Sequence, residues 1–358
     1  MRFFLLLFLS LSLFAREGGS LYLSFKSFIS NNAVSLKDIT GDWSGSYKSP
    51  KGGFKALVLN DYKIGYKERL FSLSYVLKSE IISKASSDFA DLVHSVKQGE
   101  QLDVGRNYDL QLSLKGFVAD GIEYERELYR YKKDGLYFDL RGTLSLLHGL
   151  FLQNAEINGY AKALGKKSYA FLARMEYYYS SNYIYDLDVD KPTALGYSTD
   201  LKIEGGYGKY DFLLKIENLM GYLYWKDTPY SDVHLKSQNE EVDENGYTKY
   251  NPTVYGYEGK RRYKQHLMPK YTAKIGCSLG EYNLFLKNIH IEKIDIFSLG
   301  AVKSFRDFLL FLEYDTRFHT VTTALSTDNL SLTLGFENIS IPKSKSLEMG
   351  VSYRYVFE

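Results

Sequence analysis

Apolar and polar residues alternate with a period of two along most of this chain. In the segment 71–80, odd-numbered positions from Phe71 to Leu77 are apolar or aromatic, whereas Ser72, Lys78 and Glu80 are polar. The segments 110–118, 138–146, 169–179 and 210–217 repeat the pattern. Such alternation indicates strands with one apolar and one polar face. Many such strands of about ten residues are typical of a transmembrane antiparallel β-barrel, because a bilayer cannot satisfy the backbone groups of an open sheet edge.

The first fifteen residues, MRFFLLLFLSLSLFA, carry one cation, an apolar run and a final small residue. This is the pattern of a secretory signal peptide cleaved after Ala15. The apolar run is shorter than the ~20 residues that a membrane-spanning helix needs, and no other window suggests such a helix. We therefore expect an exported chain in which residues 16–358 form one barrel domain.

The composition excludes several classes of protein. A lone Cys277 rules out an internal disulfide framework. The 45 Lys and Arg against 43 Asp and Glu leave no charge excess of the kind that binds nucleic acid. We expect no cofactor.

The C-terminal stretch EMGVSYRYVFE alternates with aromatic residues on one face. Gly350, Tyr353, Tyr355 and Phe357 resemble the C-terminal signal of Gram-negative outer-membrane β-barrels, and Glu358 departs from that pattern because family members usually end on the aromatic residue. The resemblance implies a location in the outer membrane, contact with outer-membrane lipid, and recognition of the last strand by the barrel-assembly machinery.

Fifteen segments have strand character, but single-chain bacterial barrels have an even number of strands with long loops on the outer side. Both requirements hold if one candidate between 118 and 168 is false. The segment 153–163 shows the least contrast, so we predict fourteen strands, with twelve and sixteen as alternatives. The words GYGKYDF and KIENLMGYLYW, within 195–225, are loosely similar to the FadL and TraF-like families of 14-strand barrels. No ligand-binding residue is carried over from them.

Two connections carry patterns of their own. Apolar residues at 89, 92, 93 and 96, after a capping serine at 87, predict a short helix. The segment 226–263 is long and tyrosine-rich, with acidic residues early and basic residues late. It is a candidate lid or constriction loop, or a solvated hairpin.

Motifs for catalysis or metal binding are weak. Gly276 to Gly280 matches G-x-S-x-G, but Ser278 would lie at a strand end before another strand, and a nucleophile elbow needs a strand–turn–helix. Asp186, Asp188 and Asp190 lack the glycine and glutamate of a calcium loop. The six histidines show no metal-ligand spacing. We predict neither an enzyme nor a metal site.

Charged residues lie opposite the apolar faces of several predicted strands, and in a barrel that side is the lumen. Opposed charges across a pore discriminate between solutes. The sequence therefore predicts a channel or transporter for small polar or amphipathic solutes. The alternatives are a non-conducting surface or assembly barrel with partner-binding loops, and a barrel lipid hydrolase. The predicted pore-lining residues are Glu313, Asp315, Arg317 and His319 on one strand, with Asp139, Arg141, Arg174, Glu176, Lys215 and Glu217 on others.

Overall fold

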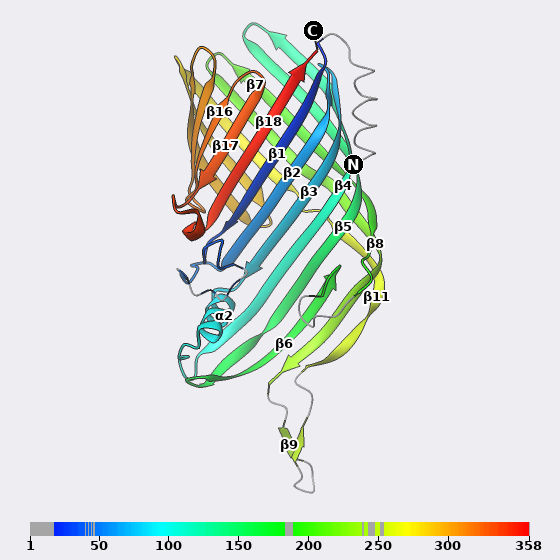
Figure 1. Ribbon diagram of the computed structural model, residues 1–358, viewed down its shortest axis with the longest axis vertical. Coiled ribbons are helices and arrows are strands. Elements are labelled where there is room, and N and C mark those ends of the chain that lie inside the picture. Colours follow the sequence, from blue (N-terminus) through cyan, green and yellow to red (C-terminus); the bar gives the residue numbers. More distant parts are fainter. Residues whose placement is uncertain are drawn as a thin grey trace.

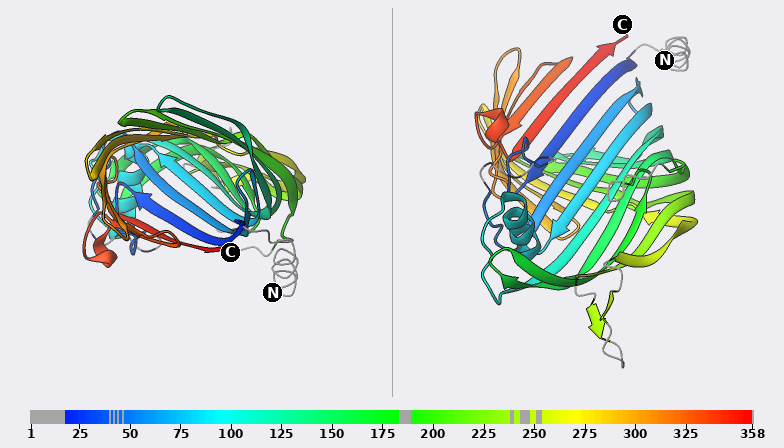
Figure 2. Two further views of the ribbon diagram at one scale, coloured as in Figure 1. Left: turned by 90° about the horizontal axis from the view of Figure 1, so that it is seen from above. Right: turned by 60° about the horizontal axis from the view of Figure 1, so that its bottom comes forward.

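The structure, a computed structural model, describes residues 18–357 except 40, 42, 44, 46, 183–188, 238–239, 243–247 and 251–253. An antiparallel sheet closes on itself into a barrel (Figures 1 and 2). The signal-peptide prediction lies outside the described residues. The strands are β1 (Ser20–Asn31), β2 (Phe54–Lys67), β3 (Phe71–Ala85), β4 (Asn107–Lys133), β5 (Leu136–Gly165), β6 (Ser168–Tyr179), β7 (Ala194–Tyr207), β8 (Tyr210–Lys236), β9 (Glu240–Val242), β10 (Thr248–Tyr250), β11 (Val254–His266), β12 (Lys270–Leu279), β13 (Tyr282–Ile291), β14 (Ile294–Ser304), β15 (Leu309–Asp315), β16 (Val321–Ser326), β17 (Leu330–Phe336) and β18 (Ser346–Val356).

The wall has fourteen strand positions, which confirms the predicted barrel and its strand number. β6 and β7 follow one another in a single position, since both pair antiparallel with β5 and β8. β11 and β12 likewise share the position beside β8. β18 pairs with β1 from Ser20 opposite Val356 to Ser30 opposite Ser346, and this long ladder closes the barrel.

The number fourteen is right, but the predicted strand boundaries were partly wrong. The segment 153–163 is a genuine strand, continuous with 136–148 in β5, and 107–118 and 121–131 are likewise one strand, β4. Bulges interrupt the β4–β5 register at Val118/Ala119 and Glu127/Tyr129 and shift the alternation there. Conversely, 281–299 and 305–324 each contain parts of two strands. The two mergers and the two divisions leave fifteen segments, and the wall has fourteen positions because the segments 168–184 and 198–206, as β6 and β7, share one of them.

The two ends of the barrel differ. Short connections join strands at the end where β18 finishes, which we call the turn end. The opposite, loop end carries the long connections 32–53, 86–106 and 237–253. There β4, β5, β6, β8 and β11 extend well beyond β13 to β18, so that one side of the wall is taller (Figure 1).

The predicted helix is present as α2 (Ser87–Gln98), at the loop end. The capping residue is Ser86 and not the predicted Ser87: the Ser86 side chain accepts the N–H of Phe89, and Gly99 ends the helix in a left-handed conformation. The helix packs Leu92 against Tyr108 and Leu110 of β4. A 3₁₀ turn, η1 (Ile341–Lys343), lies in the β17–β18 connection. Within the described residues, no helix has the length and apolar character to cross a membrane.

The segment 226–263 is mostly strand rather than loop. Its first part continues β8 to Lys236, and its last part forms most of β11. Between them β9 and β10 make a small two-stranded ribbon, which points away from the barrel along its long axis (Figure 1).

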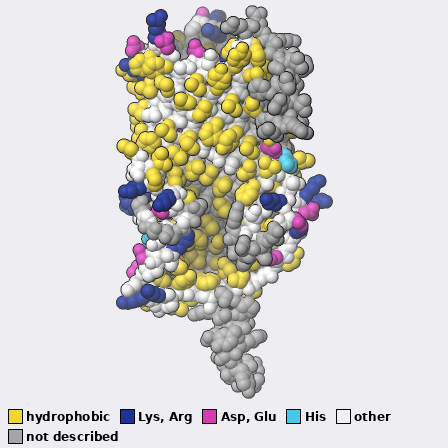
Figure 3. Space-filling view, viewed as in Figure 1, with side chains coloured by type: hydrophobic (Ala, Val, Ile, Leu, Met, Phe, Trp, Pro, Cys, Tyr) yellow, Lys and Arg dark blue, Asp and Glu magenta, His cyan; other side chains and the backbone are white. Residues whose placement is uncertain are grey.

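The outer face of the barrel is apolar. Leu286, Leu299 and Leu312 are each more than half exposed on β13, β14 and β15. Hydrophobic side chains cover most of the face shown in Figure 3, and charged groups gather toward its ends and edges. This is the surface that a lipid-embedded barrel presents.

Candidate functional site: the barrel lumen

The inward face changes character about halfway along the barrel. On β13, Lys287 faces the lumen near the turn end, but Ile289 and Ile291 face it further on. The outward side chain of His290, at that level, bonds to Asp295 on β14 (2.8 Å). β2 changes in the same way, from Asp61 and Lys63 to Leu59 and Leu57. On these strands the lumen wall has a charged layer toward the turn end and an apolar layer toward the loop end, whereas β14 and β15 add the apolar Val302, Leu309 and Phe311 toward the turn end.

The charged layer is built from cross-strand ion pairs. Glu123 on β4 accepts Lys78 of β3 (3.0 Å) and pairs with Lys63 of β2. Ser145 of β5 also donates to its carboxylate (3.2 Å). The Glu123 side chain is only 7% exposed. A buried carboxylate held by two cations stabilises the wall, because removing it would leave both lysines buried without a counter-ion.

A second group of charges surrounds Glu217 on β8, which accepts Lys215 (3.0 Å) and Lys270 of β12 (2.9 Å). Next to it, Asn218 interrupts the strand with a positive φ of 55°. Its amide donates to both oxygens of buried Glu80 (3.3 Å each) and to the carbonyl of Met268 (3.1 Å). Asparagine tolerates this conformation better than most residues, so one residue bends β8 and joins three elements across the lumen.

A cavity of about 290 Å³ lies at the boundary between the two layers. Lys287 and Glu313 form an ion pair at its charged side, while Leu59, Ile289 and Ile296 line its apolar side. Two further cavities, of about 360 and 470 Å³, lie toward the turn end, and Lys26 borders all three. The 470 Å³ cavity is lined by residues that include Asp328, in the β16–β17 turn, and Arg354 of β18. These cavities follow the lumen from the turn end to its middle.

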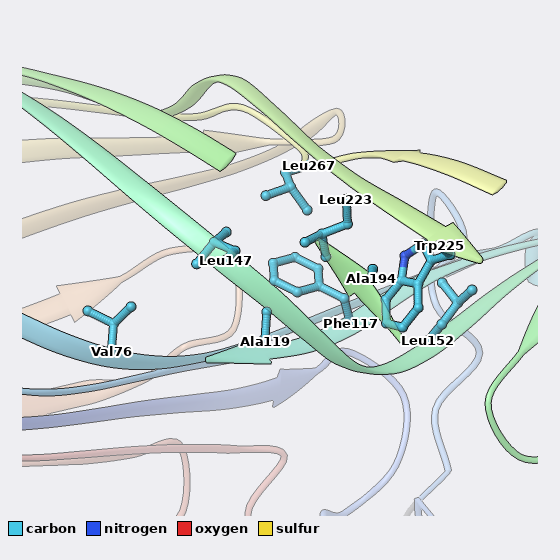
Figure 4. Packing of buried hydrophobic residues seen from close by; sticks show 9 residues of the cluster. All are labelled: Val76, Phe117, Ala119, Leu147, Leu152, Ala194, Leu223, Trp225 and Leu267. Atoms are coloured by element: carbon cyan, nitrogen blue, oxygen red, sulfur yellow. The ribbon is translucent and has the colours of Figure 1, made fainter. Parts of the chain in front are cut away.

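Beyond this cavity the apolar layer consists of buried side chains. Two clusters fill it, and both contain side chains from opposing walls. In the first, Phe117 lies beside Leu223, and Trp225 lies next to Ala194 and Leu152 (Figure 4); Trp225 also donates to Gln265 of β11 (2.9 Å). Gln265 in turn donates to the Gly116 carbonyl of β4 (3.2 Å). The second cluster, called the isoleucine seal below, comprises Leu57, Ile82, Met268, Ile291, Ile294, Ile296 and Phe318.

The Glu292 carboxylate bonds the loop-end side of the isoleucine seal to strands across the lumen. Glu292, in the two-residue β13–β14 turn, accepts Lys84 of β3 (2.8 Å) and Lys115 of β4 (2.9 Å). Burial alone would raise the pKa of this carboxyl, but the hydrogen bonds and positive charges of Lys84 and Lys115 hold it below its usual value. The turn thus bonds to strands on the opposite wall.

The quartet on 313–319 is divided by the structure, and its placement on one strand is wrong. Glu313 and Asp315 lie on β15 and line the 290 Å³ cavity. β15 ends at Asp315, whose carboxylate accepts the backbone N–H groups of Arg317 (3.0 Å), Phe318 (2.6 Å) and Thr320 (3.0 Å). The β15–β16 connection therefore turns sharply, with Phe318 directed into the isoleucine seal.

The other two residues of the quartet, Arg317 and His319, do not lie on a strand with their side chains in the lumen. Arg317 donates to the Asp295 carbonyl (3.2 Å). His319 has a positive φ of 59°, and its Nδ1 is 2.7 Å from the hydroxyl of Tyr314, which is on the outward face. A turn anchored by an aspartate, rather than a charged strand, accounts for the close spacing of these groups.

The other predicted pore residues fall into three places. Lys215 and Glu217 border the central cavity. Asp139 and Arg141 lie near the turn end of β5, bonded to one another (3.0 Å), and Arg141 also reaches Glu125 (3.1 Å).

Arg174 and Glu176 are on β6, in the tall side of the wall. Arg174 pairs with Glu176 (3.0 Å) and Asp232 (2.7 Å), and the Arg174 side chain is half exposed. These two residues are not among those that border the three lumen cavities.

Several lumen residues could not be identified from the sequence, because their contacts with residues on neighbouring strands determine what they do. The inverted alternation in NIHIEKIDIF, with isoleucines at every second position inward, was a signal that could have located the apolar layer. Lys78 and Glu80 were placed on a polar face but not among the predicted pore residues, and the residues missed altogether are Lys26, Asp61, Lys63, Asn218, Lys270, Lys287, Glu292 and Glu348.

The weak catalytic and metal motifs gain no support from the geometry. Ser278 lies within β12, ahead of a turn into β13, and its Oγ accepts a hydrogen bond from Asn283 (3.2 Å). Asp190 pairs with Lys260 (2.6 Å), while Asp186 and Asp188 lie outside the described residues. Among the described residues, no three His, Cys, Asp or Glu side chains gather as metal ligands.

The C-terminal residues occupy the closing strand. Tyr353 and Tyr355 are about half exposed on the outer face, and the Tyr355 ring contacts Phe357 edge-on. Gly350 lies opposite Lys26 in the β1–β18 ladder. Their part in barrel assembly stays a prediction.

No family model matches the sequence, and no curated protein matches it. Solved structures similar to this chain include a deletion variant of the TodX monoaromatic hydrocarbon channel, at a TM-score of 0.46 and 10% identity over 96% of this chain and 92% of that one. The Pseudomonas putida toluene transporter TodX follows at 0.44 and 11%, over 96% and 91%. The CymD monoaromatic hydrocarbon channel has 0.28 and 10%, over 96% and 90%. By its own strand pairing, the chain is a 14-strand antiparallel β-barrel with the architecture of outer-membrane proteins.

Proposed function

We propose that this protein is an outer-membrane channel or transporter that carries small amphipathic solutes through its lumen. The observation that supports this most directly is the series of three cavities, each bordered by Lys26, between the turn end and the middle of the barrel. By the loop-length rule for such barrels, the turn end faces the periplasm and the loop end faces outward.

The lining of the central cavity indicates the class of solute. Charged groups such as Lys287 and Glu313 lie on one side, and Ile289, Ile296 and Leu59 lie on the other. A molecule with one polar and one apolar part would satisfy both sides, whereas burying an unpaired charge against the isoleucines would be unfavourable. At about 290 Å³ the cavity is at the lower limit of typical ligand pockets, which favours small solutes.

Liposome swelling tests the proposal. Purified, folded protein in liposomes should admit small amphipathic solutes faster than protein-free liposomes do, and the rate should fall steeply as solute size increases. The Lys26→Trp variant places a larger side chain at the position that borders all three cavities. Liposomes that contain this variant, refolded in the same way, should admit the solutes more slowly. Swelling rates equal to those of protein-free liposomes for every solute would contradict the proposal and would favour a non-conducting surface or assembly barrel.

A further inference from the structure

We infer that the tip of the β13–β14 hairpin, residues 292–297, is the outward gate of the lumen, and that Glu292 latches it to the opposite wall. The inference deepens the proposed function, because a gate controls entry to the solute path. It rests on three features of the structure: the bonds that hold the tip, the backbone pairing that the tip lacks, and the seal beneath it.

The bonds that hold the tip come from strands far away in the sheet. Lys84 and Lys115 belong to β3 and β4, whereas Glu292 lies between β13 and β14, and β15 to β18, β1 and β2 separate them round the wall. Charge-assisted hydrogen bonds to a carboxylate are stronger than neutral ones. The three side chains are between 21% and 35% exposed, so water screens the pairs only partly. One carboxylate thus bridges the mouth of the barrel.

The tip itself has few backbone ties to the wall. The β12–β13 ladder ends where Lys270 meets Ile291, and the β14–β15 ladder begins only at Ser298 opposite Asp315. Between these limits, the described hydrogen bonds from the neighbouring β15–β16 turn are those of Thr316 to the Phe297 carbonyl and of Arg317 to the Asp295 carbonyl. β11, the next strand toward the loop end, pairs with β8. The turn and the β14 arm of the tip, residues 292–297, can therefore move without breaking the β12–β13 or the β14–β15 ladder.

The turn makes the tip move as one piece. Glu292 and Lys293 have φ values of 48° and 64°, the conformation of a tight two-residue hairpin turn. Ile291 and Ile294 flank the turn and are completely buried in the isoleucine seal. Displacing the turn and the β14 arm would therefore withdraw Ile294 from its contact with Ile291, which the β12–β13 ladder holds in place.

The seal beneath the tip consists of side-chain contacts alone. Ile291, Ile294 and Ile296 of the hairpin meet Leu57 and Ile82 of β2 and β3. Apolar constrictions close pores by excluding water, and they open when their walls separate. Loss of the latch would let the hairpin separate from β2 and β3, which would admit water to the central cavity.

The gate can be tested by a distance measurement that does not depend on transport. Two cysteines carry spin labels in a Cys277→Ser background: Lys162→Cys, at the loop end of β5, and Lys293→Cys, at the tip. Pulsed electron paramagnetic resonance measures the distance between the two labels. With Glu292 present, we expect one narrow distance. Glu292→Gln should broaden the distribution and add a longer distance, because the amide cannot form the two ion pairs.

Two further variants make the result decisive. Glu100→Gln, an exposed glutamate just after α2, is the matched control and should leave the narrow distance unchanged. If Glu292→Gln fails to fold, the double variant Lys84→Met, Lys115→Met removes the same ion pairs from the other wall. A narrow, unchanged distance in folded protein that lacks the latch would overturn the gate.

Conductance of the same variants separates the gate from the proposed function. If the distance lengthens and Glu292→Gln also conducts more often in planar bilayers, both stand. If the distance lengthens but neither wild type nor variant conducts, the gate stands and the transport proposal fails. If the wild type conducts and the distance does not change, transport stands and the gate fails.

Discussion

The turn-end half and the loop-end half of the lumen differ in the kind of side chain that faces inward. Toward the turn end the wall is polar inside and apolar outside, and carboxylates such as Glu123 and Glu217 are each shared by two lysines. Toward the loop end the pattern inverts. There isoleucines face inward, and the His290–Asp295 pair faces outward. A charged lining holds cavities open, whereas an apolar lining closes the barrel by packing.

The comparison shows that the wall can carry its own closure. The isoleucine seal uses residues of β2, β3, β13 and β14, the β11–β12 connection and the β15–β16 turn, all of them parts of the wall itself. Changes in the two halves should therefore have different consequences: those in the charged half alter stability and selectivity, and those in the apolar half alter stability and closure.

The largest loss of stability is expected in the charged half. Glu123→Ala leaves Lys63 and Lys78 buried without their shared partner and should lower the free energy of unfolding by about 3–5 kcal/mol. Urea unfolding followed by tryptophan fluorescence, to which both Trp43 and buried Trp225 contribute, measures it. Glu176→Ala, which removes an exposed partner of Arg174, is the matched control and should have little effect. Equal losses for the two variants would contradict a special role for buried pairs.

A slightly smaller loss is expected in the apolar half. Ile294→Ala leaves a cavity in the isoleucine seal and should cost about 2–5 kcal/mol in the same unfolding assay. Leu299→Ala, on the same strand but more than half exposed on the outer face, should cost less. If the outward leucine were the more costly of the two, the seal would not be a packed layer.

Ion selectivity should change when a cavity charge is reversed. Glu313→Lys places a cation beside Lys287 in the central cavity and should shift the reversal potential toward anion preference in a salt gradient. Arg317→Glu reverses a charge in the β15–β16 turn and should shift it much less. A larger shift for Arg317→Glu would mean that the solute path does not pass the cavity.

The smallest expected effect is a dependence of the latch on pH. The pKa of Glu292 is held below its usual value, so its bonds to Lys84 and Lys115 are complete above the ordinary carboxyl pKa and are lost as the pH falls through the lowered one. The spin-label distance should stay narrow at neutral pH and broaden only in strong acid.

Other charged groups surround the tip, including His290 and Asp295. Glu292→Gln is therefore the control, because it removes the carboxylate and keeps these groups. Its distance should already be broad at neutral pH and should change little on acidification. Broadening of the wild-type distance near neutral pH would assign the effect to another group.

The fold could be predicted from the sequence because alternation and lipid exposure are local properties. The strand boundaries could not be predicted in the same way, because the turns and bulges that set them leave no clear mark in the sequence. The turn between β13 and β14 is Glu292-Lys293, which lacks the glycine or asparagine that usually marks such a turn. Bulges within β4 and β5 shifted the alternation and made one strand look like two.

The lumen was less predictable than the fold. Which charges meet depends on the register between strands, as when Glu292 meets two lysines more than 170 positions away along the chain. Glu217 could be assigned to the lumen from its own strand, but its partner Lys270 could not. The quartet at 313–319 failed for another reason, since Asp315 ends its strand by accepting three backbone N–H groups.

The central claim is that a solute path through the lumen is closed by the apolar half of the wall. Single-channel recordings of the wild type and of Ile294→Ala, Phe318→Ala test it most directly, with folding checked by resistance to unfolding in detergent. We predict rare openings of the wild type and frequent, larger openings of the variant. Identical recordings from the two folded proteins would contradict the claim.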